Sequence, residues 1–151
     1  MLIILIVLTG IMAGIYFSFS VFMMKALNQM PALLAAQVMN EINDVIVNTL
    51  FLPLFFGTTL WLAGLAVWEI SQWNPQTSPR VVTGSGLYII GMFLVTAFGN
   101  VPLNNKLKSL ENNDVALMEY WDTYHRDWLK LNHLRTITCV ITTALLAASA
   151  V

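Results

Sequence analysis

The sequence predicts an all-α protein, a membrane-embedded four-helix bundle with a short interfacial helix after the first span and an amphipathic helical extension leading into the fourth. Composition is the first observation behind this prediction. Of the 151 residues, 58% are hydrophobic and only 10% are charged, whereas a soluble domain carries about 25% charged residues. The second observation is that the few charged residues are clustered, which leaves four long uncharged segments. The length suits one domain, so we expect a single four-helix transmembrane domain over residues 1–151.

The four uncharged segments cover residues 1–24, 45–68, 81–105 and 136–151. A membrane-spanning helix needs about 20 mostly apolar residues, and the first three segments meet that length. The fourth contains only 16 residues, so we expect its helix to begin upstream, near residues 129–134. The first segment lacks a basic start and a small-residue cleavage site. We therefore expect a retained helix rather than a signal peptide.

The segments around these spans contain further helix signals. Pro31 can occupy the first turn of a helix, and we expect a short helix lying at the membrane interface within residues 25–44. Pro53 is expected to bend the second span, because proline removes one backbone donor. After Pro102 the chain contains no glycine or proline, and short polar side chains before Asp114 are typical of a helix start. We therefore predict one helix from Asp114 into the last span.

The basic residues predict the orientation of these spans. With four spans, one side of the membrane carries only Arg80. The other side carries six basic residues: Lys25, Lys106, Lys108, Arg126, Lys130 and Arg135. Because cytoplasmic loops carry an excess of Lys and Arg, we expect loops 25–44 and 106–135 to be cytoplasmic and both termini to lie outside, in the cell (inner) membrane.

Several classes of function are disfavoured by composition. The net charge of −1 argues against nucleic acid as a partner, because phosphate backbones require a basic surface. The single Cys139 excludes an intramolecular disulfide and dithiol chemistry. Glu119, Asp122 and His125 have a spacing that could hold a metal, but the neighbouring basic residues indicate a solvated helix face. We therefore expect no metal and no cofactor.

An unusual set of polar and aromatic residues shares one face of the last predicted helix. Its members recur at steps of 4, 3, 4 and 3: Trp121, His125, Trp128, Asn132 and Arg135, with Tyr124 beside them. One interpretation is an interfacial belt, in which Trp and Tyr lie at headgroup level and Arg reaches toward it. The alternative is a face that lines the bundle interior or a wet cavity, since ionisable groups at that depth rarely face lipid.

The third predicted span ends in a second polar cluster. Pro102 cannot donate to the carbonyl of Phe98, so that carbonyl is freed near the membrane surface. Asn100 and Asn104 are four residues apart and could share a face with this defect. Either both amides satisfy the broken backbone, or they donate to a ligand oxygen in the same cavity as the polar residues of the last helix.

These residues also resemble a known family, the anthrone oxygenase-like integral membrane proteins. The specific part of the resemblance is Asn100-Val101-Pro102-Leu103-Asn104, followed by Trp121, Tyr124, Trp128 and the run Asn132-His133-x-Arg135-Thr136. Earlier segments agree: Gly14 to Phe17, Val21 to Met24, the Ile42-Asn43 pair, and Phe51 to Thr58. The similarity covers most of the chain.

The resemblance implies oxidation of a lipophilic, anthrone-like phenol by dioxygen. The anion of such a substrate can pass an electron to dioxygen directly, so no cofactor is obligatory. The implied roles place His133, or alternatively His125, as the base. Arg135, Asn100 and Asn104 would stabilise the anion, while Trp121 and Trp128 would stack on the ring, with Tyr124 and Asn132 completing the binding site.

Other functions stay open on the sequence alone. The chain could be a non-enzymatic membrane subunit that binds a lipid, a quinone or a partner helix without chemistry. It could also hold a metal or haem assembled across subunits, and a homo-oligomer is open. In each case the expected partners are the lipid bilayer and a lipophilic aromatic small molecule.

Overall fold

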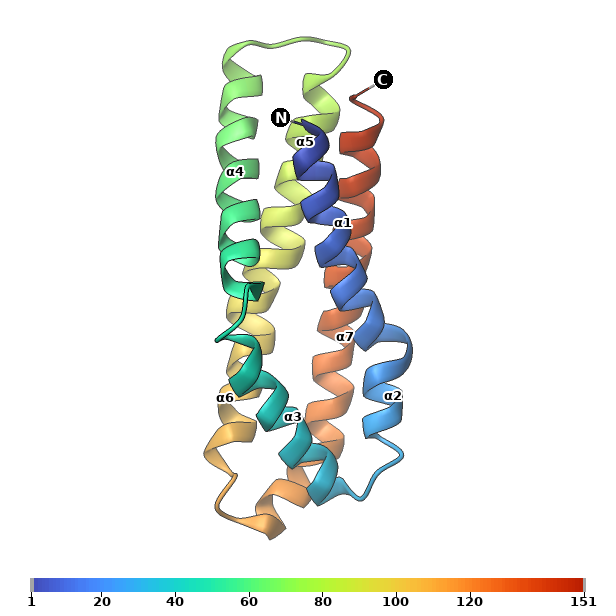
Figure 1. Ribbon diagram of the computed structural model, residues 1–151, viewed down its shortest axis with the longest axis vertical. Helices are drawn as coiled ribbons and strands as arrows, with labels where there is room; N and C mark the ends of the chain where they lie inside the picture. Colours follow the sequence, from blue (N-terminus) through green and yellow to red (C-terminus); the bar gives the residue numbers. More distant parts are fainter. Residues whose placement is uncertain (1, 151) are drawn as a thin grey trace.

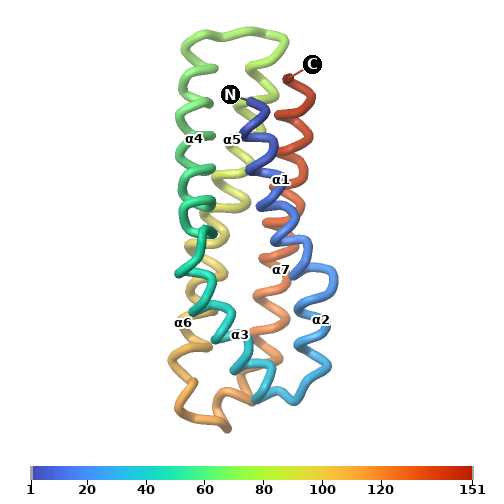
Figure 2. The backbone as a smooth tube through the Cα atoms, in the orientation of Figure 1, coloured from blue at the N-terminus to red at the C-terminus, as the bar shows by residue number. Residues whose placement is uncertain are grey.

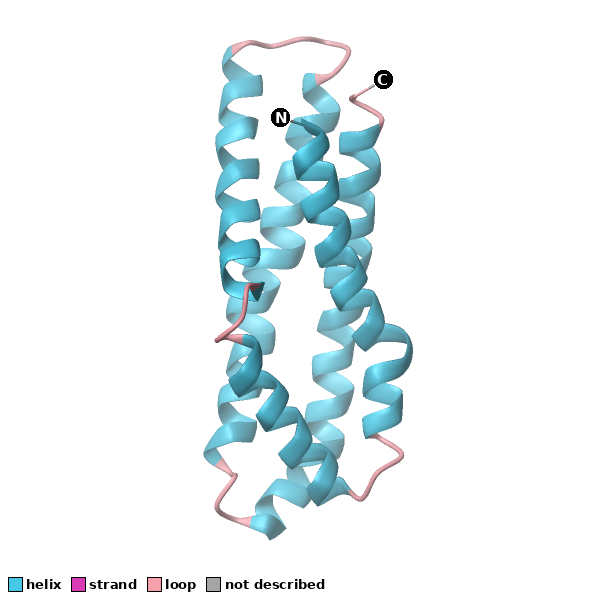
Figure 3. Cartoon of the chain, in the orientation of Figure 1, coloured by secondary structure: helices cyan, strands magenta, loops and turns pink. Residues whose placement is uncertain are grey.

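The chain is all-helical in a computed structural model that describes residues 2–150, and no strand occurs in that range (Figure 3). The elements in order are α1 (Leu2–Ser18), the π-helix η1 (Phe19–Met23), α2 (Met24–Leu27), α3 (Ala32–Ile46), α4 (Phe51–Ser71), α5 (Ser78–Tyr88), the π-helices η2 (Ile89–Leu94) and η3 (Thr96–Asn100), α6 (Val101–Ser109) and α7 (Asp114–Ala147). Continuous helices therefore run through residues 2–27 and 78–109, each with π-helical turns inside it.

Within the described range, three helices are long and apolar enough to cross a membrane: Leu2–Leu27, Phe51–Ser71 and Ser78–Ser109. Large apolar side chains also face outward, for example Leu60 at 71% and Phe98 at 80% exposure. Both findings are compatible with a membrane protein. The all-helical class is confirmed, while the fourth span stays a prediction, because α7 does not meet the same criterion.

The longest helices run side by side along the molecule (Figures 1 and 2). α7 packs against both α1 and α5, and α4 packs against α5. Both chain ends lie at the same end of the molecule as the turn between α4 and α5. The core of this half contains apolar side chains from all four helices, including Leu5, Met12, Leu62, Tyr88 and Cys139.

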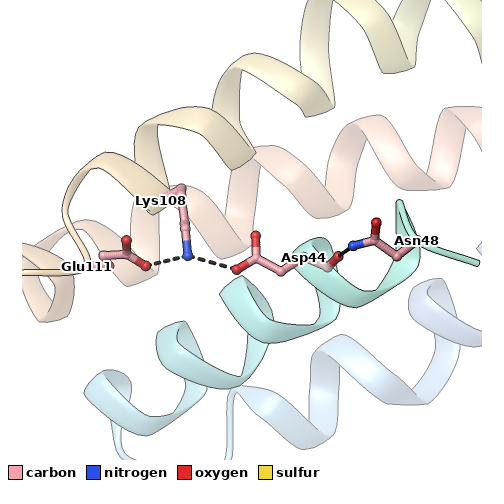
Figure 4. A network of polar contacts seen from close by, with 4 residues as sticks. All are labelled: Asp44, Asn48, Lys108 and Glu111. Carbon is pink, nitrogen blue, oxygen red and sulfur yellow. Dashed lines mark hydrogen bonds and ion pairs between the residues drawn. The ribbon is translucent and has the colours of Figure 1, made fainter.

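At the other end, α3 crosses over α7 and α6 (Figure 1). A second core forms there, and it includes Met24, Met39, Leu107, Leu117 and Trp121. On its surface Lys108 joins α6 to α3: its Nζ lies 2.8 Å from the Asp44 carboxylate and 2.5 Å from that of Glu111 (Figure 4). The predicted short helix after the first span is thus present, and it covers one side of the molecule.

The last helix begins where the sequence predicts. The Asn113 side chain accepts a hydrogen bond from the backbone N–H of Ala116 at 3.1 Å, which caps the first turn of α7. The helix then continues without interruption for 34 residues, a length of about 50 Å at 1.5 Å per residue. The predicted extension from Asp114 is confirmed.

Proline acts differently in the two predicted positions. Pro53 lies in the first turn of α4, where a missing N–H costs no hydrogen bond, and α4 is uninterrupted. The expected bend within this span is therefore not supported. Around Pro102, by contrast, η3 ends at Asn100 and α6 begins at Val101. The wider π-helical turns lie next to the proline that lacks a donor.

Candidate functional site

A cleft of about 340 Å³ lies between α1, α3, α4, the third long helix and α7. Most of its lining is apolar and much of it is aromatic, with Phe19, Phe51, Phe55, Phe56 and Phe93. The polar lining residues are few: Tyr16, Asn43, Thr96, Asn100, Asn104 and Arg135, with the indole of Trp128. An apolar cleft with a few convergent polar groups is the usual form of a small-molecule site.

Among the described residues of this lining, Arg135 alone is charged, and it is 4% exposed. Its guanidinium donates to Asn132 Oδ1 at 2.8 Å and to Thr96 Oγ1 at 3.3 Å. Its Cζ lies 4.4 Å from the ring centre of Tyr16 and 5.0 Å from that of Trp128, so two aromatic faces hold the cation. Its Nε is buried without a hydrogen-bond partner.

No carboxylate balances this buried charge within residues 2–150. The ion pairs there join other residues, and no described lining residue of the cleft is acidic. A buried cation without a counter-charge is costly. The arrangement therefore leaves Arg135 able to bind an anion in the cleft.

Asn132 holds Arg135 in place from behind the cleft. Its Nδ2 donates to the backbone carbonyl of Tyr16 and to Ser20 Oγ, both at 2.8 Å. Its Oδ1 therefore points toward Arg135 and accepts a hydrogen bond from the guanidinium. Asn132 does not line the cleft, so it orients the cation rather than contacting a ligand.

The two asparagines of the third helix reach across to other helices. Asn100 donates to the backbone carbonyl of Trp128 at 3.2 Å, and Asn104 donates to Asn43 Oδ1 at 3.0 Å. Neither amide bonds to the carbonyl of Phe98, so they do not repair the backbone at Pro102. The Oδ1 of Asn100 and the Nε1 of Trp128 are both buried without a partner.

Tyr124 completes a polar chain at this end of the cleft. Its hydroxyl donates to Asn104 Oδ1 at 2.9 Å. Burial raises the pKa of the Tyr124 phenol, with the nearby Asn43 side chain opposing that shift, so the hydroxyl stays protonated and remains a donor. Tyr124 does not line the cleft itself.

Besides Asn132 and Tyr124, three more residues expected at the site do not line the cleft. His133 is exposed, His125 lines a separate hollow with Lys25, and Trp121 is packed in the second core, where its Nε1 donates to an asparagine of the loop before α3. For His133 the reason is helix geometry. Each residue turns the helix by about 100°, so His133 points away from its neighbour Asn132.

Sequence reasoning also missed residues that line the cleft. Tyr16, Phe19 and Asn43 come from segments before residue 47, and Phe55 and Phe93 come from predicted spans. The Ile42-Asn43 pair, noted above in the resemblance, was a usable signal. The aromatic residues gave none, because aromatic side chains are common throughout this apolar sequence.

No metal site is evident in the part of the chain that the structure describes: no three His, Cys, Asp or Glu side chains there lie close enough together to hold an ion. What the cleft offers is an apolar slot with aromatic walls, one buried cation, and amide and indole groups with unused hydrogen-bonding capacity.

Comparison with known proteins bears on this site directly. The family model of anthrone oxygenase matches residues 47–145, about two thirds of the chain. The match includes Asn100, Asn104, Trp128 and Arg135, and it leaves out Tyr16, Phe19 and Asn43. No curated protein and no solved structure matches the chain. The family match covers well over half of the sequence and confirms the resemblance, so this chain belongs to the anthrone oxygenase family.

Proposed function

We propose that the protein is a membrane oxidoreductase that oxidises a flat, lipophilic phenol or anthrone with dioxygen in the cleft around Arg135. The single observation that carries the proposal is a buried guanidinium, without an acidic partner among the described residues, at the wall of an aromatic cleft. Such a site favours the anion of an apolar ring compound. The family to which the chain belongs supports this class of reaction.

The chemistry needs little from the protein beyond anion stabilisation. An anthrone has an acidic CH₂ group beside its rings, and the positive charge of Arg135 would lower the pKa of the bound substrate so that this proton leaves to water. The carbanion passes an electron to dioxygen, and the resulting radical pair forms a C–O bond as a peroxide. After protonation the peroxide loses water. The CH₂ group and O₂ thus become C=O and H₂O.

The remaining roles follow from position in the cleft. Trp128 and the phenylalanines would hold the ring, while Asn100 would present its amide beside the developing oxyanion. Asn104 lies one turn further along the same helix. Neither histidine takes part in the proposed reaction, because neither His125 nor His133 lines the cleft.

We also propose how the chain is placed in the membrane. The C-terminal part of α7, which contains Asn132 and Arg135, would form the fourth span. Both side chains are buried in the interior, as expected for polar groups at that depth. The end with α3 and α6 would face the cytoplasm because it carries most of the basic residues.

Oxygen consumption by the purified protein in nanodiscs, with anthrone as substrate, tests the proposed reaction. Replacing Arg135 with leucine should lower kcat/KM by about 100-fold or more, as loss of one oxyanion donor does elsewhere. Arg135→Lys keeps the charge and should retain part of the activity. Arg126→Leu is the matched control, since Arg126 is exposed and pairs only with Asp127, and we expect less than a twofold change.

The proposal fails if folded wild-type protein does not accelerate oxygen uptake above spontaneous oxidation with any anthrone or hydroquinone. Folding of each variant is checked by gel filtration and helical circular dichroism. If the protein instead binds the corresponding quinone but consumes no oxygen, the second candidate holds: a ligand-binding membrane subunit. The lack of a described histidine or carboxylate in the cleft lining favours that candidate.

A further inference from the structure

A chain of hydrogen bonds runs from α7 to α3 and stops at the wall of the cleft. The Tyr124 hydroxyl donates to Asn104 Oδ1, and Asn104 Nδ2 donates to Asn43 Oδ1. The chain then ends, because Asn43 Nδ2 is buried and has no hydrogen-bond partner. A buried donor left unpaired costs about 1–3 kcal/mol, so a ligand atom that accepts a hydrogen bond from Asn43 Nδ2 would be stabilised.

Asn43 is placed to offer that donor to a ligand. It lines the cleft, so an oxygen of a ligand bound there is the acceptor available to its Nδ2. Its own oxygen is already occupied by Asn104, and Tyr124 orients Asn104 in turn. The three side chains thus present a donor rather than an acceptor to the cleft.

This donor and the anion site belong to separate sets of contacts. Arg135 lies against Trp128, and Asn100 bonds to the backbone of the same tryptophan. Asn104 is four residues further along the third helix than Asn100, which is about one helical turn, or 5–6 Å. A ligand that binds Arg135 through one oxygen and accepts a hydrogen bond from Asn43 therefore needs a second oxygen on another part of its ring system.

We propose that Asn43 recognises a second, neutral oxygen of the substrate, so that the cleft prefers flat ring compounds bearing one oxygen at Arg135 and another on the far edge. This inference rests on the proposed function and deepens it. Asn104 and Tyr124 are positioning residues for Asn43. Asn43 lies outside the residues that the family model matches.

The test compares substrates that differ only in the second oxygen. Oxygen uptake is measured in nanodiscs with anthrone, with 1-hydroxyanthrone, whose hydroxyl lies beside the carbonyl, and with 2- and 3-hydroxyanthrone, whose hydroxyls lie on the far edge. Wild-type protein should prefer a far-edge compound, and Asn43→Leu should lower kcat/KM for that compound about tenfold more than for anthrone, through KM. Asn48→Leu is the matched control, since exposed Asn48 bonds only to the backbone of Asp44.

A binding measurement separates this inference from the proposed reaction. Quenching of tryptophan fluorescence by anthraquinone and by 2-hydroxyanthraquinone reports affinity without turnover. Loss of the hydroxyl preference in Asn43→Leu supports the inference even if no oxygen is consumed. The inference is overturned if Asn43→Leu changes all compounds alike, or changes none, in a variant that gel filtration shows to be folded. The proposed function then still stands on the anthrone assay.

Discussion

The two halves of the molecule use polar side chains in different ways. In the half that contains both termini, several threonine hydroxyls bond back to their own helix: Thr9 to the carbonyl of Leu5 at 2.9 Å, Thr59 to Phe55 at 2.7 Å and Thr143 to Cys139 at 2.9 Å. Hydroxyls also link helices there, as Thr142 does to the carbonyl of Gly84. Around the cleft, amides and the guanidinium bond between helices, as in the contacts of Asn132 with Tyr16 and of Asn104 with Asn43.

Polar side chains in the first half therefore serve helix packing, whereas those around the cleft are available for ligand binding. A hydroxyl that bonds to its own helix satisfies a polar group locally and leaves the helix surface free to pack closely. Amides that reach other helices fix the walls of a cleft, and they leave some groups for a ligand. We therefore expect substitutions near the cleft to change binding and activity as well as stability, and those in the packed half to change stability alone.

After Arg135→Leu, the largest effect is expected from Asn132→Leu, which breaks the contact that orients Arg135. The change removes the acceptor of Arg135 Nη2 and two hydrogen bonds to the first helix. Because these groups are buried, unfolding free energy should fall by about 2–4 kcal/mol, and kcat/KM for anthrone should fall at least tenfold. Thermal unfolding and oxygen uptake measure the two losses.

Asn112→Leu is the control for this change, because Asn112 is an exposed residue in the turn before the last helix and should alter neither quantity. An Asn132→Leu protein with wild-type stability and wild-type activity would show that Arg135 does not depend on this contact.

Two glycines of the third helix allow helix packing in this half of the molecule to be tested. A Cβ at Gly91 would lie 2.3 Å from Thr138 Cγ2, and Thr138 cannot turn away easily because its hydroxyl bonds to two carbonyls of α7. Gly91→Ala should therefore push the third helix from α7 and destabilise the protein by about 1–3 kcal/mol. Thermal unfolding in detergent measures this loss.

Gly86 lies in the same continuous helix but has free space where a Cβ would be added. A Cβ there meets nothing within 4 Å, so Gly86→Ala should be neutral or stabilising by up to about 1 kcal/mol, through helix propensity. Equal destabilisation by both substitutions would mean that the close approach at Thr138 does not hold the helices together.

The comparison of the two halves also explains what the sequence could predict. The helices follow from charge gaps and from local signals such as the Asn113 cap, which depend on neighbours in the chain. The convergence of Asn100, Asn104, Trp128 and Arg135 on one cleft was one of the two alternatives that the sequence left open, and these residues do line it. Their roles in catalysis stay a prediction.

What the sequence could not predict depends on distant contacts. Helix spacing places His125 near the face of Arg135, but the angular drift over ten residues carries it to another hollow. Asn43 and Tyr16 enter the cleft because α3 and α1 pack beside α7, and a single sequence contains no local signal for that packing. The apolar sequence of α1 would be equally compatible with either face turned inward.

The smallest effect is expected from Tyr124→Phe, which shortens the polar chain that ends at Asn43. The change removes one hydrogen bond to Asn104, worth about 1 kcal/mol, and should weaken the preference for a far-edge hydroxyl without affecting anthrone. Tyr120→Phe is the control, because Tyr120 is less buried and lies outside the chain of hydrogen bonds.

The same substitution makes a prediction about pH, because the folded protein holds the Tyr124 proton more tightly than the unfolded chain. Burial raises the pKa of this phenol, whereas an unfolded tyrosine titrates near 10, at about its ordinary value. Its contribution to stability is therefore fully present below about pH 10 and is lost as pH rises toward the folded pKa. Wild-type protein should lose more stability than Tyr124→Phe between pH 9 and pH 11, on the order of a few tenths of a kcal/mol to 1 kcal/mol, in thermal unfolding. Identical slopes for the two proteins would mean that the Tyr124 hydroxyl is open to water, and the polar chain to Asn43 would then lack its anchor on α7.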